Sequence, residues 1–260
     1  MRRLLWGLAL LLISSAALAD EIPYRRYAVA DGLPNEDVNA LAQADDGRLY
    51  VGTPGGLSVY NGQQFRPVEV PDSIGAAKID HIVADGRSVW AGTSNGWVLK
   101  VRARRVTRVL PKVRSVERLL VRRDTLHIVA KRSYRTLAPG ADRPLRHPLK
   151  MSFRLPGRQP RPDVGRDLAD ADFGPRGHLW VLDFQLGPGR LQPDGSVDFA
   201  GVPHGSGLQG WWRHLRFGPD GTALLYGRKT VYRFHPDSAR LTPLLDRGQN
   251  FSLRNLACRM

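Results

Sequence analysis

Residues 38–60 read VNALAQADDGRLYVGTPGGLSVY, in which short runs of apolar and aromatic residues are separated by Asp46-Gly47 and Gly55-Gly56. Asp-Gly pairs supply the positive-φ residues that tight hairpin turns require. Runs of about five residues bounded by such turns are typical of β-strands, and they are too short for helices. This stretch therefore predicts consecutive antiparallel strands.

The same order of strands and turns returns along the chain. Residues 79–101 read IDHIVADGRSVWAGTSNGWVLKV, and weaker copies lie at 116–137, 168–191 and 212–234. The second strand of each of the five units starts at matching positions about 43.5 residues apart on average: Leu49, Val89, Leu126, Leu179 and Ala223. A repeated unit of ~40–45 residues with room for four strands is typical of a propeller blade.

We therefore predict an all-β protein, a β-propeller with about five four-stranded blades in an incomplete ring. The blades are expected near residues 35–66, 76–109, 113–147, 164–200 and 209–245, and residues 251–260 are expected to start a sixth. A pair of β-sandwiches is the alternative, but it gives no reason for a common period across five units. In an open ring the first and last blades are expected to expose an apolar face, and thus to favour self-association.

The N-terminus has the pattern of a secretory signal peptide. Arg2 and Arg3 precede an apolar run from Leu4 to Ile13, and small residues follow up to Ala19. The run is about half the length that a membrane-spanning helix needs, so cleavage before Asp20 is favoured over permanent anchoring. Residues 1–19 are thus predicted to direct export, which would place the mature chain in the periplasm.

The charge of the chain is strongly positive. The formal net charge is +15, and removing Arg2 and Arg3 leaves +13. A basic surface attracts polyanions, but the arginines are scattered, so a nucleic-acid-binding arm is not predicted. The single cysteine, Cys258, cannot form an intrachain disulfide; a bond to another thiol and an incidental role both remain open.

Large aromatic residues fit a structural role between blades. Tyr50, Trp90 and Trp180 fall on the second strand of their units, where such residues are expected in the core. Of the adjacent Trp211 and Trp212, one is expected in the core and one at the surface. Residues 138–167 hold six prolines and many arginines, and they are predicted to form an extended loop.

Motifs of known catalytic or metal chemistry are missing from the sequence. Gly205-Ser206-Gly207 lacks the pattern of a nucleophile elbow. The seven histidines include no pair at metal-binding spacing, and the Asp-Gly turns lack the further ligands of a calcium loop. We predict no catalytic residue, no metal and no cofactor.

A binding site is predicted at one mouth of the central channel. In a propeller the segments just before each innermost strand surround that mouth, and they contain Asp37, Lys78, Ser115, Asp167 and Trp211, with Arg114, Arg166 and Arg213 adjacent. Arginine beside tryptophan suits an anionic or sugar-like ligand through bidentate hydrogen bonds and stacking. The predicted ligand-binding residues are Lys78, Arg114, Arg166, Trp211 and Arg213.

Residues 27–65 resemble the opening of the two-component-regulator propeller family. The resemblance rests on Asp31-Gly32-Leu33-Pro34, on residues 46–53 (DGRLYVGT) and on Tyr60-Asn61-Gly62, and residues 90–93 (WAGT) give its best later echo. It implies a periplasmic sensor of a larger protein, usually seven-bladed or doubled, followed by a β-sandwich, a membrane helix and a histidine-kinase or diguanylate-cyclase module. No such output or membrane segment follows here, so the chain is interpreted as a fragment, joined to the membrane only through a missing C-terminal part.

Three functions are compared on this basis. The favoured one is ligand sensing in the periplasm, with a small-molecule or oligosaccharide ligand, no nucleic acid and no enzymatic activity. The second is an exported lyase or glycosidase acting on an acidic polysaccharide, which needs two carboxyl groups roughly 5–9 Å apart; Asp37 and Asp167 are its candidates. The third is a scaffold without a ligand.

Overall fold

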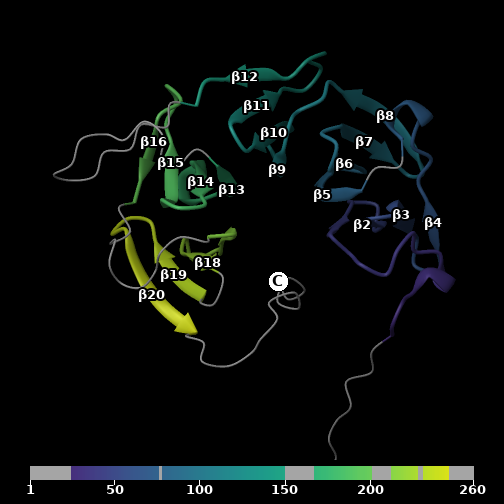
Figure 1. Cartoon of the computed structure of the whole chain (residues 1–260), viewed down its shortest axis with the longest axis horizontal. Coiled ribbons are helices and arrows are strands. Elements are labelled where there is room, and N and C mark those ends of the chain that lie inside the picture. Colours follow the sequence, from purple (N-terminus) through teal and green to yellow (C-terminus); the bar gives the residue numbers. More distant parts are fainter. Residues whose placement is uncertain (1–24, 76–77, 150–166, 201–211, 228–230, 246–260) are drawn as a thin grey trace, which may run out of the picture.

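The computed structural model describes residues 25–75, 78–149, 167–200, 212–227 and 231–245. The predicted signal peptide and the predicted start of a sixth blade lie outside these residues. In the described part, the strands form five four-stranded antiparallel sheets, and each sheet is a meander whose strands follow chain order (Figure 1). The predicted all-β propeller of about five blades is confirmed.

The strands of the five blades, from the innermost to the outermost, have the following bounds. Blade 1 contains β1 (Ala40–Gln43), β2 (Leu49–Thr53), β3 (Gly56–Tyr60) and β4 (Phe65–Pro67). Blade 2 contains β5 (Ile79–Asp85), β6 (Ser88–Thr93), β7 (Val98–Arg102) and β8 (Arg105–Leu110). Blade 3 contains β9 (Val116–Arg122), β10 (Thr125–Ala130), β11 (Ser133–Leu137) and β12 (Leu145–His147). Blade 4 contains β13 (Leu168–Phe173), β14 (Leu179–Asp183), β15 (Gly187–Leu191) and β16 (Val197–Phe199). Blade 5 contains β17 (His214–Phe217), β18 (Ala223–Tyr226), β19 (Val231–His235) and β20 (Arg240–Leu245).

One segment differs from its predicted conformation. Residues 138–167 were expected to form an extended loop, yet β12 lies within them and closes blade 3 as its fourth strand. The register pairs Arg146 with Arg135 and His147 with Tyr134, so the strand is held by the ladder of β11. The high proline content concealed it, because proline disfavours central strands but is tolerated beside an outer one.

The core lies between blades rather than inside one layer. Each sheet packs its face on the next sheet, and the four interfaces between neighbouring blades each contain their own apolar cluster. Tyr50, Trp90 and Trp180 are buried in three of these clusters, as predicted. Trp212 is the core member of its pair: it is buried and meets the ring of Tyr232 edge-on. Trp211 lies outside the described residues.

The described blades form an open arc. Innermost strands are neighbours in the order β1, β5, β9, β13 and β17, and in the described residues no comparable packing joins blade 5 to blade 1 (Figure 1). Leu41 on β1 shows the consequence: it is 46% exposed, whereas Leu119 on β9 and Leu215 on β17 are 2% and 0% exposed.

The free face of blade 1 is nevertheless partly covered. Leu33 and Tyr27, from the segment before β1, pack on Val51, Phe65 and Tyr60 of this blade. Tyr27 meets Phe65 edge-on, with ring centroids 5.1 Å apart. Residues that precede the first strand therefore act as a partial cap on the apolar face that was expected to be exposed. Within the described residues, no helix is long and apolar enough to span a membrane.

Candidate functional site

The residues that precede the innermost strands lie at one end of their blades. The backbone carbonyls of Lys78, Ser115 and Asp167 each accept a hydrogen bond from the residue that follows the second strand of the same blade, at 2.9 to 3.1 Å. This repeated bond places all three at the same end of their blades, where the second strand is joined to the third. We call this end the channel mouth.

Charged side chains at the mouth are largely paired with one another. The Lys78 Nζ atom lies 3.0 Å from Asp80 Oδ1, and Lys131 Nζ lies 2.9 Å from Asp167 Oδ2. Arg132 adds a longer contact of 3.5 Å to Asp167. The hydrogen bond from Lys131 lowers the pKa of Asp167, so this carboxyl stays ionised. The mouth is therefore a surface of mixed charge.

A β-bulge recurs in the innermost strands of three successive blades. In blades 2, 3 and 4 the register shifts by one residue near the mouth, which leaves Asp80, Glu117 and Ala169 without a partner on the second strand. Bulges of this kind bend a strand and redirect a side chain. Desolvation by burial raises the pKa of Glu117 to about 7, with Lys131 opposing and nearby carboxylates adding to the rise.

Beyond the bulge, one register position carries a polar residue in four of the five blades. In blades 2 to 5 this position is held by His81, Arg118, Asp170 and His214, which pair with Gly92, Val129, Leu182 and Tyr226 of the second strands, whereas blade 1 has Ala40, paired with Gly52. We call these four residues the inner row. Three of its members contact the following blade, as when His81 Nε2 lies 3.0 Å from the carbonyl oxygen of Val116, whereas His214 contacts the preceding one.

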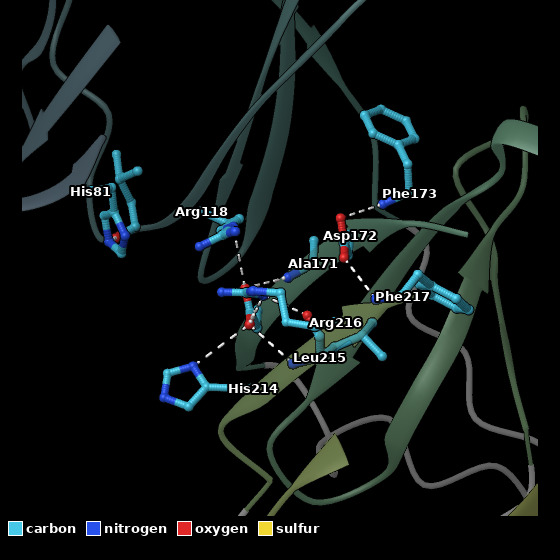
Figure 2. A network of polar contacts seen from close by, with 11 residues as sticks. His81, Arg118, Ala171, Asp172, Phe173, His214, Leu215, Arg216 and Phe217 are labelled. Carbon is cyan, nitrogen blue, oxygen red and sulfur yellow. Dashed lines mark hydrogen bonds and ion pairs between the residues drawn. The ribbon is translucent and has the colours of Figure 1, made fainter. Parts of the chain in front are cut away.

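Asp170 is the centre of this row, because Arg118, His214, Leu215 and Arg216, which Figure 2 labels, all contact its carboxylate. Its buried carboxylate accepts hydrogen bonds from the backbone N–H of Leu215 at 3.0 Å and from Arg216 Nη1 at 2.6 Å. Arg118 Nε and His214 Nδ1 lie 3.7 and 3.6 Å away. Burial alone would raise the pKa of Asp170, but the contact with His214 and the two guanidinium groups outweigh it and lower the pKa.

Asp172 repeats the arrangement two residues further along β13. It accepts hydrogen bonds at 2.9 Å from its neighbour Phe173 and from the backbone N–H of Phe217 in β17 (Figure 2). Burial raises the pKa of Asp172 despite these bonds. The two aspartates thus bind alternate N–H groups of β17, which joins the innermost strands of blades 4 and 5.

The inner row places charged and hydrogen-bonding side chains on the innermost strands of the arc. Asp170 holds two arginines and a histidine from the two neighbouring blades within contact distance of one carboxylate. The His214 side chain is 62% exposed, and Arg118 is partly exposed, so both can offer donors to a ligand. In the described residues, no group of three or more metal-binding side chains comes together.

The predicted site residues are only partly placed. Lys78, Arg114 and Arg213 are exposed or partly exposed, and they flank the innermost strands of blades 2, 3 and 5. Arg166 and Trp211 lie outside the described residues, so their position remains a prediction. Asp37 is exposed, and its backbone N–H is bound by Asn35 Oδ1 at 2.8 Å.

The inner row was missed because the sequence was aligned without the bulge. A shift of one residue in β5, β9 and β13 moves each side chain to the other face of its sheet. The signal that could have found the row is the recurrence of a polar residue two positions after the first apolar residue of these strands: His81, Arg118 and Asp170.

Comparison with known proteins agrees with this fold. Residues 32–55, which include β1 and β2, match the family described as two component regulator propeller. This chain carries a two component regulator propeller repeat. No curated protein sequence matches the chain significantly.

Solved structures of similar fold extend the comparison. The extracellular domain of a hybrid two component system from B. thetaiotaomicron is 16% identical, with a TM-score of 0.66, over 85% of this chain and 32% of that one. The extracellular domain of a one component system from the same organism gives 16% identity and a TM-score of 0.64, over 81% of this chain and 28% of that one. The chain thus spans about a third or less of these proteins. At this identity the likeness establishes the propeller fold alone.

A third solved structure of similar fold is that of an enzyme variant. A catalytically inactive variant of virginiamycin B lyase from Staphylococcus aureus, with quinupristin, is 12% identical, with a TM-score of 0.64, over 82% of this chain and 71% of that one. Sensors and enzymes therefore share this architecture, and the fold by itself does not decide between them.

Proposed function

We propose that this chain is the ligand-sensing propeller of an exported bacterial signal-transduction protein. It would act in the periplasm and pass on its ligand occupancy to a histidine-kinase or diguanylate-cyclase module of a larger protein. The observation that carries the proposal is the match of blade 1 to the two component regulator propeller. The fold likeness to two extracellular domains of bacterial regulatory systems supports it.

The ligand is proposed to be a small molecule or oligosaccharide with acidic groups, bound at the channel mouth. Arg114 and Arg213 are exposed there, and guanidinium groups bind carboxylates with two parallel hydrogen bonds. Lys78 would contribute by exchanging its ion pair with Asp80 for one with the ligand. Arg166 and Trp211 complete the proposed set, with the indole as a stacking surface for a sugar ring.

Calorimetry with a matched pair of ligands tests this proposal. The chain, purified from a periplasmic extract, is titrated with oligogalacturonate and with its methyl ester, which keeps the sugar rings but lacks the negative charges. We expect binding of the acid form only. Arg114→Gln and Arg213→Gln should each weaken it about tenfold, the loss of one charge-assisted hydrogen bond.

The control variant is Arg87→Gln, which removes the same charge from an exposed turn of blade 2. It should bind as the wild type does. Equal weakening by all three variants would show a general charge effect and contradict a site at the mouth. Binding of acid and ester alike would contradict the anionic ligand class.

A second candidate function is an exported enzyme acting on an acidic polysaccharide, and one observation favours it. Glu117, with a pKa raised to about 7 by burial, is suited to proton transfer near neutral pH. Asp167, proposed from the sequence as a catalytic carboxyl, is instead held in ion pairs by Lys131 and Arg132. Release of new reducing ends or unsaturated products from polygalacturonate, lost in Glu117→Gln, would support this function over sensing.

A further inference from the structure

Arginines gather on the outer strands where blade 2 faces blade 3. The register places Arg102 directly opposite Arg105 on the outer strand pair of blade 2, and Arg135 directly opposite Arg146 on that of blade 3. A third like-charge pair joins Lys100 to Arg108. We call Arg102, Arg105, Arg108, Arg135 and Arg146 the rim arginines.

The core clusters show that the rim arginines face one another across a single junction. On blade 2, Trp90 belongs to the apolar cluster shared with blade 3. Trp90 is paired with Lys100 on the next strand, and Lys100 is paired with Arg108 on the strand after that. On blade 3, Ile128 belongs to the same cluster and pairs with Arg135. Side chains at paired positions share a face of the sheet. Alternation along β7 and β8 adds Arg102 and Arg105 to this face.

Acidic residues compensate little of this charge. Asp85 is occupied by Lys100, whose Nζ atom lies 2.6 Å from its Oδ2 atom. Asp142, on the loop before β12, is an exposed acid near the rim, and Arg143 follows it directly. The other junctions differ: Arg104 beside blade 1 contacts Glu69, and Arg190 on blade 4 contacts Asp198.

The rim arginines are held in place without being fully satisfied. Arg108 donates from Nη2 to the carbonyl oxygen of Ala141, which fixes its guanidinium across the junction. Arg135 Nε is buried and has no hydrogen-bond partner among the described residues. A buried donor without a partner costs about 1–3 kcal/mol, and like charges directly opposite are destabilising. An anion at this position would relieve both costs.

Protection of an outer strand against aggregation is the simpler explanation for charges at a rim. It accounts for Arg105 and Arg146, which are exposed, but it does not account for Arg108 and Arg135, which are half-buried and directed toward the neighbouring blade. Charges that only keep an edge soluble would point into solvent.

We propose that the rim arginines of blades 2 and 3 together bind a multivalent oxyanion, a ligand with several phosphate or sulfate groups. Guanidinium groups on both blades match the paired oxygens of such groups. This site is separate from the channel mouth, and it does not depend on the sensing function proposed above.

Thermal unfolding in tripolyphosphate tests the proposal, with sodium chloride at matched ionic strength as the reference. The test variants are Arg146→Gln, which is exposed, and the double variant Arg135→Gln/Arg146→Gln. The control is Arg87→Gln/Arg233→Gln, which removes the same charge from exposed positions at other junctions. Tripolyphosphate should raise the Tm of the wild type and of the control, while the rise is smaller in the test variants.

Calorimetry gives the second readout, with about tenfold weaker tripolyphosphate binding expected for Arg146→Gln. Co-sedimentation with phosphatidylglycerol vesicles, against phosphatidylcholine vesicles, separates a lipid headgroup from a soluble phosphate as the natural source. In low salt without anion, the double variant should be at least as stable as the wild type, since the like-charge pair of Arg135 and Arg146 is gone. Equal responses of test and control variants to tripolyphosphate would overturn the proposal.

Discussion

The carboxylate of Asp170 in β13 binds the backbone N–H of Leu215 in β17 at 3.0 Å, and so it links the innermost strands of blades 4 and 5. Innermost strands of a propeller have one edge that no other strand covers, and the polar groups on this edge need partners. Asp170 supplies one from the preceding blade. The same carboxylate also forms ion pairs with Arg118 and Arg216, so one side chain links blades 3, 4 and 5.

Replacement of Asp170 by alanine should be strongly destabilising. The Asp170→Ala variant leaves Arg118 and Arg216 partly buried without the carboxylate that contacts them, and it leaves the Leu215 N–H unpaired. Removal of one partner from a buried ionic network costs ~3–5 kcal/mol. Urea unfolding followed by tryptophan fluorescence measures the loss.

The matched control for this variant is Asp198→Ala, which removes an exposed carboxylate from its pair with Arg190. Exposed pairs contribute about 0–1 kcal/mol, so this variant should unfold near the wild-type midpoint. Similar losses in the two variants would mean that the Asp170 network adds no more than a surface ion pair.

Glu117 should make the protein less stable as the pH rises through the neutral range. Its folded pKa is about 7 against a normal value of 4.5, because burial disfavours the ionised carboxylate. The folded state therefore holds more protons than the unfolded state between these values, and stability falls as the pH rises from 4.5 to 7. Glu117→Gln should remove this fall and give a higher Tm than the wild type at alkaline pH.

Differential scanning calorimetry at a series of pH values tests this expectation. Glu36→Gln, at an exposed residue paired with Arg26, changes the formal charge by the same amount and should follow the wild-type profile. If Glu117→Gln also follows that profile, the carboxyl of Glu117 is hydrated in solution.

The repeat and the core followed from the sequence because both are local patterns. Gly47 and Gly86 occupy turns with φ of 80° and 60°, as the Asp-Gly pairs predicted. Tyr50 and Trp90 are buried because the alternation of a strand fixes which residues face the neighbouring blade. The turn residues and the alternation of side chains along each strand are therefore sufficient to predict the five-bladed arc.

The inner row did not follow from the sequence, because it depends on contacts between blades. Asp170 and Leu215 are 45 residues apart, and no local pattern pairs them. The bulge at Glu117 adds a shift of one residue that propensities do not reveal. The like-charge pair of Arg135 and Arg146 was hidden for a related reason, since the strand that carries Arg146 was read as a loop.

His127 should give the opposite pH dependence to Glu117. It occupies the second-strand position that Tyr50 and Trp90 hold in other blades, and its Nδ1 atom lies 2.6 Å from the hydroxyl of Tyr134. Burial, with a contribution from His147, lowers its pKa from 6.5 to about 4. The neutral ring in the folded state therefore stabilises the protein above pH 6.5, and this stability is lost as the pH falls toward 4.

Titration of the histidine ring signals by NMR measures this directly. The His127 signal should remain that of a neutral ring at pH 5.5. This pH lies between the ordinary histidine pKa of 6.5 and the pKa of about 4 that His127 has in the folded protein. His127→Phe should reduce the acid sensitivity of the Tm, while His178→Gln, at an exposed histidine, should leave it unchanged. A His127 signal that titrates near pH 6.5 would show that its ring is solvated.

The open arc makes a final prediction about two leucines on innermost strands. Leu41 and Leu215 lie on β1 and β17, but Leu41 is 46% exposed because no blade covers it, whereas blade 4 fully buries Leu215. Leu215→Ala should cost ~2–5 kcal/mol through a cavity, and Leu41→Ala should cost less than ~1 kcal/mol. Urea unfolding of the two variants at low concentration gives the comparison, and sedimentation detects any dimer that covers Leu41. A large loss from Leu41→Ala in a monomer would mean that the arc is closed over blade 1 in solution.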